Sequence, residues 1–271
     1  MAWMVALAVT PMAAAQVAGP VPQPLQDVGV DEHLGTTLPL DLEFRDEQGE
    51  KVTLRQFFDR GRPVLLTLNY YKCPMLCGLQ LNGLATGLEE LDWTPGAEFE
   101  IVTVSINPLE TPALATEKKQ NYIRKMERPA AAAGWHFLTG REPQIRALAD
   151  AVGFRYALDP ETGEYAHAAA IMVATPDGTV VRYLYGIEYP AKHLRLALLE
   201  AADGTIGSPF DRLVLYCYHY DPSSRRYAPV AMNIMRVGGG LTVLALGLTL
   251  GMLWARETVR RRKKDERDAN A

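Results

Sequence analysis

The sequence predicts an α/β fold with a central mixed β-sheet, flanking helices on both faces and one C-terminal transmembrane helix. Short, continuous apolar runs, which are typical of strands buried on both faces, alternate with segments of helical periodicity. The last two predicted strands form a hairpin around a Pro-Asp-Gly turn, so the sheet is expected to be mixed. Near the end of the chain, an uncharged stretch of about 18 residues is long enough to span a bilayer.

These elements follow one another along residues 31–203, which we expect to form one domain. The first is a hairpin over 40–54, with a buried face made by Leu42, Phe44, Val52 and Leu54. Further strands are expected at 63–70, 99–106 and 135–138, the last at a sheet edge, and the closing hairpin at 168–185. Helices are expected at 78–91, 111–126, 142–152 and 191–201.

Two cysteines, Cys73 and Cys77, lie where the apolar run at 63–70 gives way to a helical pattern. Side chains four residues apart share one face of a helix, so these thiols are close enough to share a metal ion or form a disulfide. The backbone N–H groups at a helix start also favour thiolate over thiol. A strand, a cysteine-bearing turn and a helix in this order predict a thioredoxin-like domain. The Cys-x-x-x-Cys spacing is one residue longer than the usual redox motif.

A histidine is expected to face this cysteine pair. Thioredoxin-like oxidoreductases carry a cis-proline opposite their cysteines, just before the strand that begins the closing hairpin. Residues 165–168 occupy that place here and contain His167 but no proline. Two thiolates and an imidazole form a soft ligand set that suits Cu(I) and, with a fourth ligand or water, Cu(II). Structural zinc normally takes four protein ligands, so we predict a copper site at Cys73, Cys77 and His167.

These motifs resemble the Sco/SenC family of thioredoxin-fold copper proteins over roughly residues 30–203. The resemblance rests on the sequence Cys73-Pro-Met-Leu-Cys77, on Ser-Ile-Asn107-Pro after the third strand, and on His167 before the Pro-Asp-Gly hairpin. It implies that the two cysteines and the histidine bind copper, and that the protein helps to assemble the binuclear copper site in subunit II of cytochrome c oxidase. The sequence departs from the family at Asn107, where an acidic residue is usual, and in its C-terminal anchor.

Three functions are compatible with a reactive cysteine pair. The first is a copper chaperone, which is not an enzyme and which passes copper to a respiratory oxidase by ligand exchange. Its Cys73–Cys77 disulfide must first be reduced, so a thiol reductant is a second expected partner. The alternative is a thiol–disulfide oxidoreductase that keeps the cysteines of the oxidase copper site reduced. A thiol peroxidase would need a threonine and an arginine beside its cysteine, and only the more distant Thr67 and Arg62 are candidates.

The two ends of the chain predict an exported protein that is held in a membrane. Residues 1–18 end in small residues like those of a signal-peptide cleavage region, although no Lys or Arg precedes Arg45, and 19–30 read as a tether. The predicted transmembrane helix spans 237–255, and the tail at 256–271 carries seven Lys or Arg against four Asp or Glu. The positive-inside rule therefore puts this tail in the cytoplasm and the main domain in the periplasm, with a single span in the inner membrane.

The juxtamembrane segment at 204–236 contains the third cysteine. Cys217 and His219 would share one face of an extended segment, a workable pair for a soft metal. The tyrosines around them are equally typical of an aromatic belt at a membrane interface. Because an odd cysteine in an exported protein needs an explanation, we predict a secondary metal or client-docking site here. The net charge of −4 gives no indication of nucleic-acid binding.

Overall fold

A computed structural model of the chain describes residues 28–72, 76–160, 162–202, 218–221, 226–229 and 231–269. The predicted signal peptide, nearly all of the tether, Cys73 and Cys217 lie outside the described residues. The backbones of Cys77 and His219 are described, but their side chains are not.

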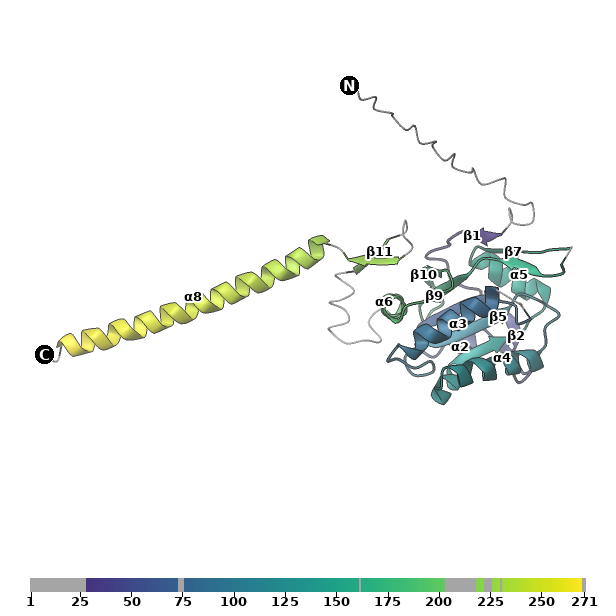
Figure 1. Ribbon diagram of the computed structural model, residues 1–271, viewed down its shortest axis with the longest axis horizontal. Helices are drawn as coiled ribbons and strands as arrows, with labels where there is room; N and C mark the ends of the chain where they lie inside the picture. The colour runs from purple at the N-terminus through teal and green to yellow at the C-terminus, as the bar shows by residue number, and fades with distance from the viewer. Residues whose placement is uncertain are drawn as a thin grey trace, which may run out of the picture.

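A five-stranded mixed sheet forms the centre of the domain, in the order β10-β9-β4-β5-β6 (Figure 1). Its strands are β4 (Val64–Asn69), β5 (Glu100–Ser105), β6 (Trp135–Leu138), β9 (Ala170–Ala174) and β10 (Val180–Tyr185). Strands β4, β5 and β6 run parallel, whereas β9 is antiparallel to both β4 and β10. The structure therefore confirms the predicted mixed sheet, with β6 at one edge.

Helices and a hairpin bury both faces of this sheet. The helices are α2 (Arg55–Phe58), α3 (Leu76–Glu89), α4 (Pro112–Lys125), α5 (Glu142–Ala151) and α6 (Ala191–Ala201), with a 3-10 helix η1 at Pro129–Ala133. Side chains of α3, α4 and α6 form one hydrophobic cluster, and those of α2 and α5 belong to the other. Successive side chains of a strand point to opposite faces, so Leu65 joins the first cluster and Leu66 the second.

The predicted N-terminal hairpin is present as β2 (Glu43–Arg45) and β3 (Lys51–Thr53), paired antiparallel. Its expected buried face consists of two fully buried residues, Phe44 and Leu54, and two half-buried ones, Leu42 and Val52. The hairpin packs into the second hydrophobic cluster, on the same side of the sheet as α5.

A second, smaller sheet contains the predicted histidine ligand. It consists of β1 (Gly29–Val30), β7 (Phe154–Leu158) and β8 (Tyr165–His167), in the order β1-β7-β8. His167 was expected just before the first strand of the closing hairpin, and that strand is β9, which starts at Ala170 and not at residue 168. His167 instead ends β8, where it pairs with Tyr156 of β7. A strand of three residues is too short to give a periodic sequence signal, and only pairing with β7 defines it.

The C-terminal part consists of a hairpin and one long helix. The hairpin is formed by β11 (Tyr218–Asp221) and β12 (Arg226–Pro229), and the helix is α8 (Ala231–Ala269), which extends away from the sheet (Figure 1). Within the described residues, only the segment Met235–Trp254 is long and apolar enough to cross a membrane, with a mean hydropathy of 1.7 and none of it buried against the domain.

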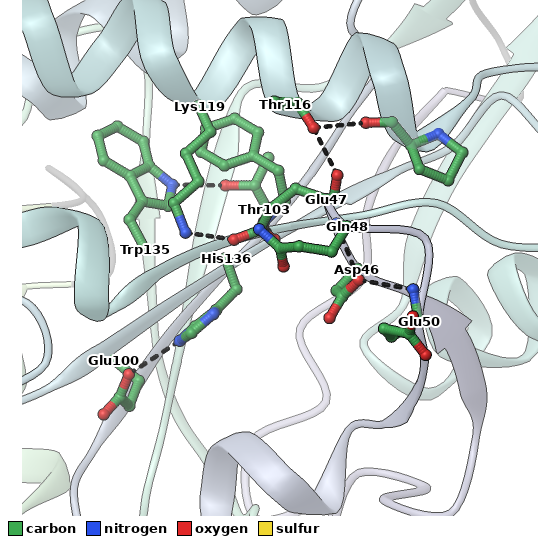
Figure 2. Close-up of polar contacts among 12 residues, drawn as sticks. Asp46, Glu47, Gln48, Glu50, Glu100, Thr103, Thr116, Lys119, Trp135 and His136 are labelled. Carbon is green, nitrogen blue, oxygen red and sulfur yellow. Dashed lines mark hydrogen bonds and ion pairs between the residues drawn. The ribbon is translucent and has the colours of Figure 1, made fainter.

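Two buried carboxylates away from the cysteine turn are balanced by cationic or imidazole groups (Figure 2). The fully buried Glu100 accepts a hydrogen bond from Arg62 at 2.7 Å and lies 3.2 Å from the imidazole of His136. Glu47, which is 6% exposed, forms an ion pair with Lys119. Buried charges are tolerated when they are paired in this way. These groups therefore belong to the structural core of the fold.

Candidate metal centre

The cysteine motif joins the central strand of the sheet to the start of a long helix. Strand β4 ends at Asn69 and α3 begins at Leu76, so Cys77 is the second residue of α3. This arrangement confirms the predicted order of strand, turn and helix. The turn lies at the carboxyl end of β4, beside the carboxyl end of the parallel strand β5, the edge at which open α/β sheets commonly bind ligands.

The structure brings His167 to the entrance of this turn. The imidazole is 6% exposed, and its ring centroid lies 6.2 Å from that of Tyr70 in an edge-to-face contact. Tyr70 precedes Cys73 by three residues. The imidazole also contacts Phe154, at 6.0 Å between ring centroids. A residue that is 90 positions or more away along the chain is therefore packed against the segment that leads into the cysteine motif.

The residues that follow the cysteine motif also contact the segment that carries His167. The side-chain amide of Gln80, three residues after Cys77, donates a 2.9 Å hydrogen bond to the carbonyl oxygen of Ala170, three residues after His167. Both flanks of the cysteine motif thus contact the stretch of chain that carries the histidine. Among the described residues, no three His, Cys, Asp or Glu side chains form a metal-binding group, and the predicted ligand set, which depends on Cys73 and Cys77, stays a prediction.

Aromatic side chains surround the imidazole. The ring of Tyr165 lies 5.6 Å from that of Tyr70 and 5.8 Å from that of Tyr156. The Tyr70 hydroxyl donates a hydrogen bond to the carboxylate of Glu164. Burial raises the pKa of Tyr156 to about 12 and also raises the pKa of Tyr165. These phenols are therefore neutral at physiological pH, and together they give His167 an aromatic surrounding without a phenolate charge.

A buried carboxylate at this edge, Glu110, was missed in the sequence. It is 7% exposed, and its oxygens accept hydrogen bonds from the backbone N–H groups of Tyr71 at 2.7 Å and Lys72 at 2.8 Å. It also accepts one from the hydroxyl of Ser105 at 2.6 Å. Sequence reasoning considered a carboxylate only at Asn107 and found none. The available signal was an acidic residue in the short connection between the end of β5 and the start of α4.

Polar side chains also lie under the turn, on the face of β4 that packs towards α3. Asn69 is fully buried, and neither its amide nitrogen nor its amide oxygen has a hydrogen-bond partner in the described part of the chain. The side-chain oxygen of Gln80 likewise has none there. Two residues before Asn69, the hydroxyl of Thr67 donates a 3.0 Å hydrogen bond to that of Thr103. The cysteine turn is therefore adjacent to buried polar groups. Thr67 has a hydrogen-bond partner among the described residues, whereas the Asn69 amide and the Gln80 oxygen have none.

The residues considered for thiol peroxidase chemistry do not lie at the turn. Arg62 precedes β4 at its amino end, the end opposite to the cysteines, and its guanidinium contacts the carboxylate of Glu100. Thr67 is fully buried in the middle of β4 with its hydroxyl bonded to Thr103. Neither side chain is placed to activate a peroxide at the cysteine motif.

The predicted secondary site is only partly described. The backbone of His219 lies in β11, opposite Ala228 of β12, which agrees with an extended segment. Cys217 directly precedes this strand and lies outside the described residues. Pairing of Cys217 with His219 stays a prediction.

Comparison with known proteins identifies the family. The family model SCO1/SenC matches residues 32–199, more than half of the chain. No curated protein matches the chain. A structure from Aquifex aeolicus VF5, described as that of a candidate electron transfer protein, is 24% identical over 65% of this chain and 98% of its own, with a TM-score of 0.56, and shares the fold.

Two further structures are Sco proteins. ScoI of Arabidopsis thaliana was solved with copper bound, and is 19% identical over 60% of this chain and 92% of its own, with a TM-score of 0.46. BsSco, described as having a disulfide switch and as a member of the Sco family of cytochrome c oxidase assembly proteins, is 20% identical over 64% of this chain and 98% of its own, with a TM-score of 0.44. On the match of its residues 32–199, this chain belongs to the SCO1/SenC family.

Proposed function

We propose that this protein is a membrane-anchored copper chaperone that carries copper on Cys73, Cys77 and His167 and delivers it to a cytochrome c oxidase. Membership of the SCO1/SenC family supports copper as the cargo and an oxidase as the client. The observation that carries the assignment to these residues is the packing of His167 against Tyr70, at 6.2 Å between ring centroids. This packing holds the imidazole ligand predicted for this site beside the entrance to the cysteine turn.

The surroundings of His167 suit a metal ligand. Its Nδ1 lies 2.9 Å from the carbonyl oxygen of Ala168, and when Nδ1–H donates to that oxygen, the lone pair of the imidazole is on Nε2. A backbone carbonyl that accepts the second ring N–H is the usual way in which proteins orient a ligating histidine. Two thiolates and one neutral imidazole favour Cu(I). Copper would leave by stepwise replacement of these ligands with thiolates or imidazoles of the client.

The cysteine pair must be reduced before it can bind copper, since a Cys73–Cys77 disulfide has no thiolate to offer. A thiol reductant is therefore part of the proposal. The alternative function uses the same pair as a thiol–disulfide oxidoreductase that reduces the client's cysteines. Its supporting observation is the position of Cys77 in the first turn of α3, where backbone N–H groups stabilise a thiolate.

Helix α8 supports anchoring in a membrane. Its central side chains, among them Leu241, Leu244 and Leu250, are each more than 60% exposed, an unfavourable arrangement in water and a favourable one in lipid. The basic residues that follow support a cytoplasmic C-terminus and a periplasmic copper domain. A C-terminal reporter that is active only in the cytoplasm checks this topology, and activity of a periplasmic reporter at the same position would reverse it.

Copper titration tests the proposed site. The detergent-solubilised full-length protein is reduced, titrated anaerobically with Cu(I) against a chromophoric chelator, and compared with Cys73→Ser/Cys77→Ser and His167→Ala. We expect loss of the tight site in the double variant and a fall of at least about tenfold in affinity for His167→Ala. His33→Ala is the matched control, because His33 is exposed, its imidazole contacts the carbonyl oxygen of Ala151, and it follows β1, at the opposite edge of the small sheet from β8.

The outcomes separate the two functions. Equal copper affinity of the wild type and His167→Ala would overturn the chaperone site. Rapid reduction of a client disulfide that does not depend on His167 would favour the oxidoreductase. The secondary site is tested in the same titration, where Cys217→Ser is expected to lower the copper stoichiometry or to impair maturation of the oxidase. If it does neither, the segment around Cys217 is only an interfacial belt.

A further inference from the structure

Glu110 determines how the chain leaves the central strand. The parallel ladder between β4 and β5 ends at the pair Asn69 and Ser105, and a last backbone hydrogen bond runs from Ile106 to Asn69 at 2.8 Å. Beyond this point the strands separate, and the N–H groups of Tyr71 and Lys72 need acceptors of another kind. The carboxylate of Glu110 supplies them, with one oxygen for each amide.

The carboxylate of Glu110 is itself fixed by hydrogen bonds from its own segment of the chain. Ser105 donates its hydroxyl to Glu110 at 2.6 Å, and the Ser105 hydroxyl oxygen accepts the N–H of Asn107 at 3.1 Å. The side-chain oxygen of Asn107 in turn accepts the N–H of Leu109 at 3.0 Å, which shapes the bend that presents Glu110. The described partners of the carboxylate are two amides and a hydroxyl, with no cation among them. Hydrogen bonds to an ionised acceptor are about twice as strong as neutral ones.

Tyr71 is fixed at both ends as a result. Its N–H is bound by Glu110, and its buried hydroxyl donates to the carbonyl oxygens of Leu138 at 2.7 Å and Thr103 at 3.0 Å. The residue two positions before Cys73 is therefore anchored to β5, to the end of β6 and to the bend that carries Glu110.

We propose that Glu110 is the positioning residue of the copper site, which fixes the backbone of Tyr71 and Lys72 so that the following cysteine enters the turn in the orientation that binds copper. This inference rests on the proposed function. Glu110 would not ligate the metal. It would act through preorganisation, because a turn that is already ordered loses less conformational entropy when its thiols close on a metal or on each other.

The test compares two buried glutamates in the full-length protein. Glu110→Gln keeps the size of the side chain but has only one acceptor oxygen. One of the two backbone N–H groups then faces the NH₂ group of the glutamine and loses its hydrogen bond. Glu47→Gln is the matched control, since Glu47 is equally buried, at 6% against 7% exposed, but pairs with Lys119 away from the turn. Glu110→Asp restores the charge and both acceptors, and serves as the conservative variant.

Cu(I) affinity and the thiol–disulfide equilibrium are measured on all variants, together with thermal unfolding. We expect Glu110→Gln to lower Cu(I) affinity about tenfold, and Glu110→Asp to recover most of it. The equilibrium constant for disulfide formation should also fall about tenfold, which corresponds to a reduction potential about 30 mV less negative. Glu47→Gln should lower thermal stability and leave both site properties unchanged.

Other results would overturn either the inference about Glu110 or the proposed function. If Glu110→Gln keeps the wild-type affinity and potential, or if Glu47→Gln changes them as much, Glu110 has a structural role only and the inference fails. If the wild type itself does not bind Cu(I), the proposed function fails separately. In that case the equilibrium constant for disulfide formation tests the positioning role by itself. A positioning role requires that this constant changes in Glu110→Gln and stays unchanged in Glu47→Gln.

Discussion

Replacing Asn69 by leucine should make the protein more stable. Asn69 is the last residue of β4 and is fully buried, with no hydrogen-bond partner for either amide atom in the described part of the chain. Its side chain points to the same face as Leu65, towards the cluster that includes α3. Leucine has the same branched arrangement of heavy atoms and no polar atoms, so Asn69→Leu removes the unsatisfied donor and acceptor without opening a cavity.

The expected gain follows from the cost of an unsatisfied buried group, about 1–3 kcal/mol. For a domain of 150–250 residues, each kcal/mol shifts the melting temperature by about 2–4 °C. The melting temperature of Asn69→Leu should therefore rise by about 2–12 °C. A substitution of a buried polar residue that stabilises is unusual, since most single substitutions destabilise.

Thermal and urea unfolding of the full-length protein in detergent, followed by tryptophan fluorescence, measure this change. Thr67→Val is the control, because Thr67 lies two residues earlier on the same face of β4 and its hydroxyl is bonded to Thr103. Thr67→Val should destabilise by about 1 kcal/mol. A loss of stability in Asn69→Leu, of the size found for Thr67→Val, would show that the amide is hydrogen-bonded after all, and would refute the reasoning.

Three further predictions concern the packing and titration of the fold. Gly83→Ala should strongly destabilise the fold, since the new Cβ would lie 1.8 Å from the carbonyl oxygen of Ile187. Gly78→Ala meets open space and should raise the free energy of unfolding by about 0.5–1 kcal/mol. Equal effects of the two substitutions in urea unfolding would contradict this. Burial raises the pKa of Tyr189, so the unfolded chain loses this proton first and stability should fall as pH rises above about 10. The fall should be shallower in Tyr189→Phe, and an unchanged slope would exclude this tyrosine as its cause. Glu100→Leu removes the buried acceptor of two half-exposed arginines and should cost about 1–3 kcal/mol in the unfolding free energy measured in urea; an unchanged value would contradict this.

The strands and helices of the central sheet could be predicted from the sequence, because each gives a pattern of apolar residues along its own length. The buried runs of β4 at Val64–Asn69 and of β5 at Glu100–Ser105 are continuous and rich in Val, Leu and Ile, as is typical of strands covered on both faces. The Pro-Asp-Gly turn defined the hairpin of β9 and β10. The short strands β7 and β8 were missed, because three to five residues give too little periodicity to distinguish a strand from a loop.

The site could be predicted only in part, for a related reason. His167 was found because the order of elements suggests which segment faces the cysteine turn. Glu110 was not found, since its partners, the amides of Tyr71 and Lys72, lie 39 and 38 positions away and are main-chain atoms that leave no trace in the sequence pattern. The unsatisfied amide of Asn69 could not be foreseen either, because satisfaction depends on every neighbouring group in the folded core.

The sequence by itself determined the order of most strands and helices, the position of the cysteine motif between β4 and α3, and an apolar helix, predicted over 237–255 and present as Met235–Trp254. Each of these depends on residues within one element or at one junction. Only the tertiary structure decided that His167 lies in the small sheet against Tyr70, and that Glu110 holds the entrance of the cysteine turn. Those contacts join segments that are distant in the chain, and their geometry is determined by strand pairing and packing rather than by local propensity.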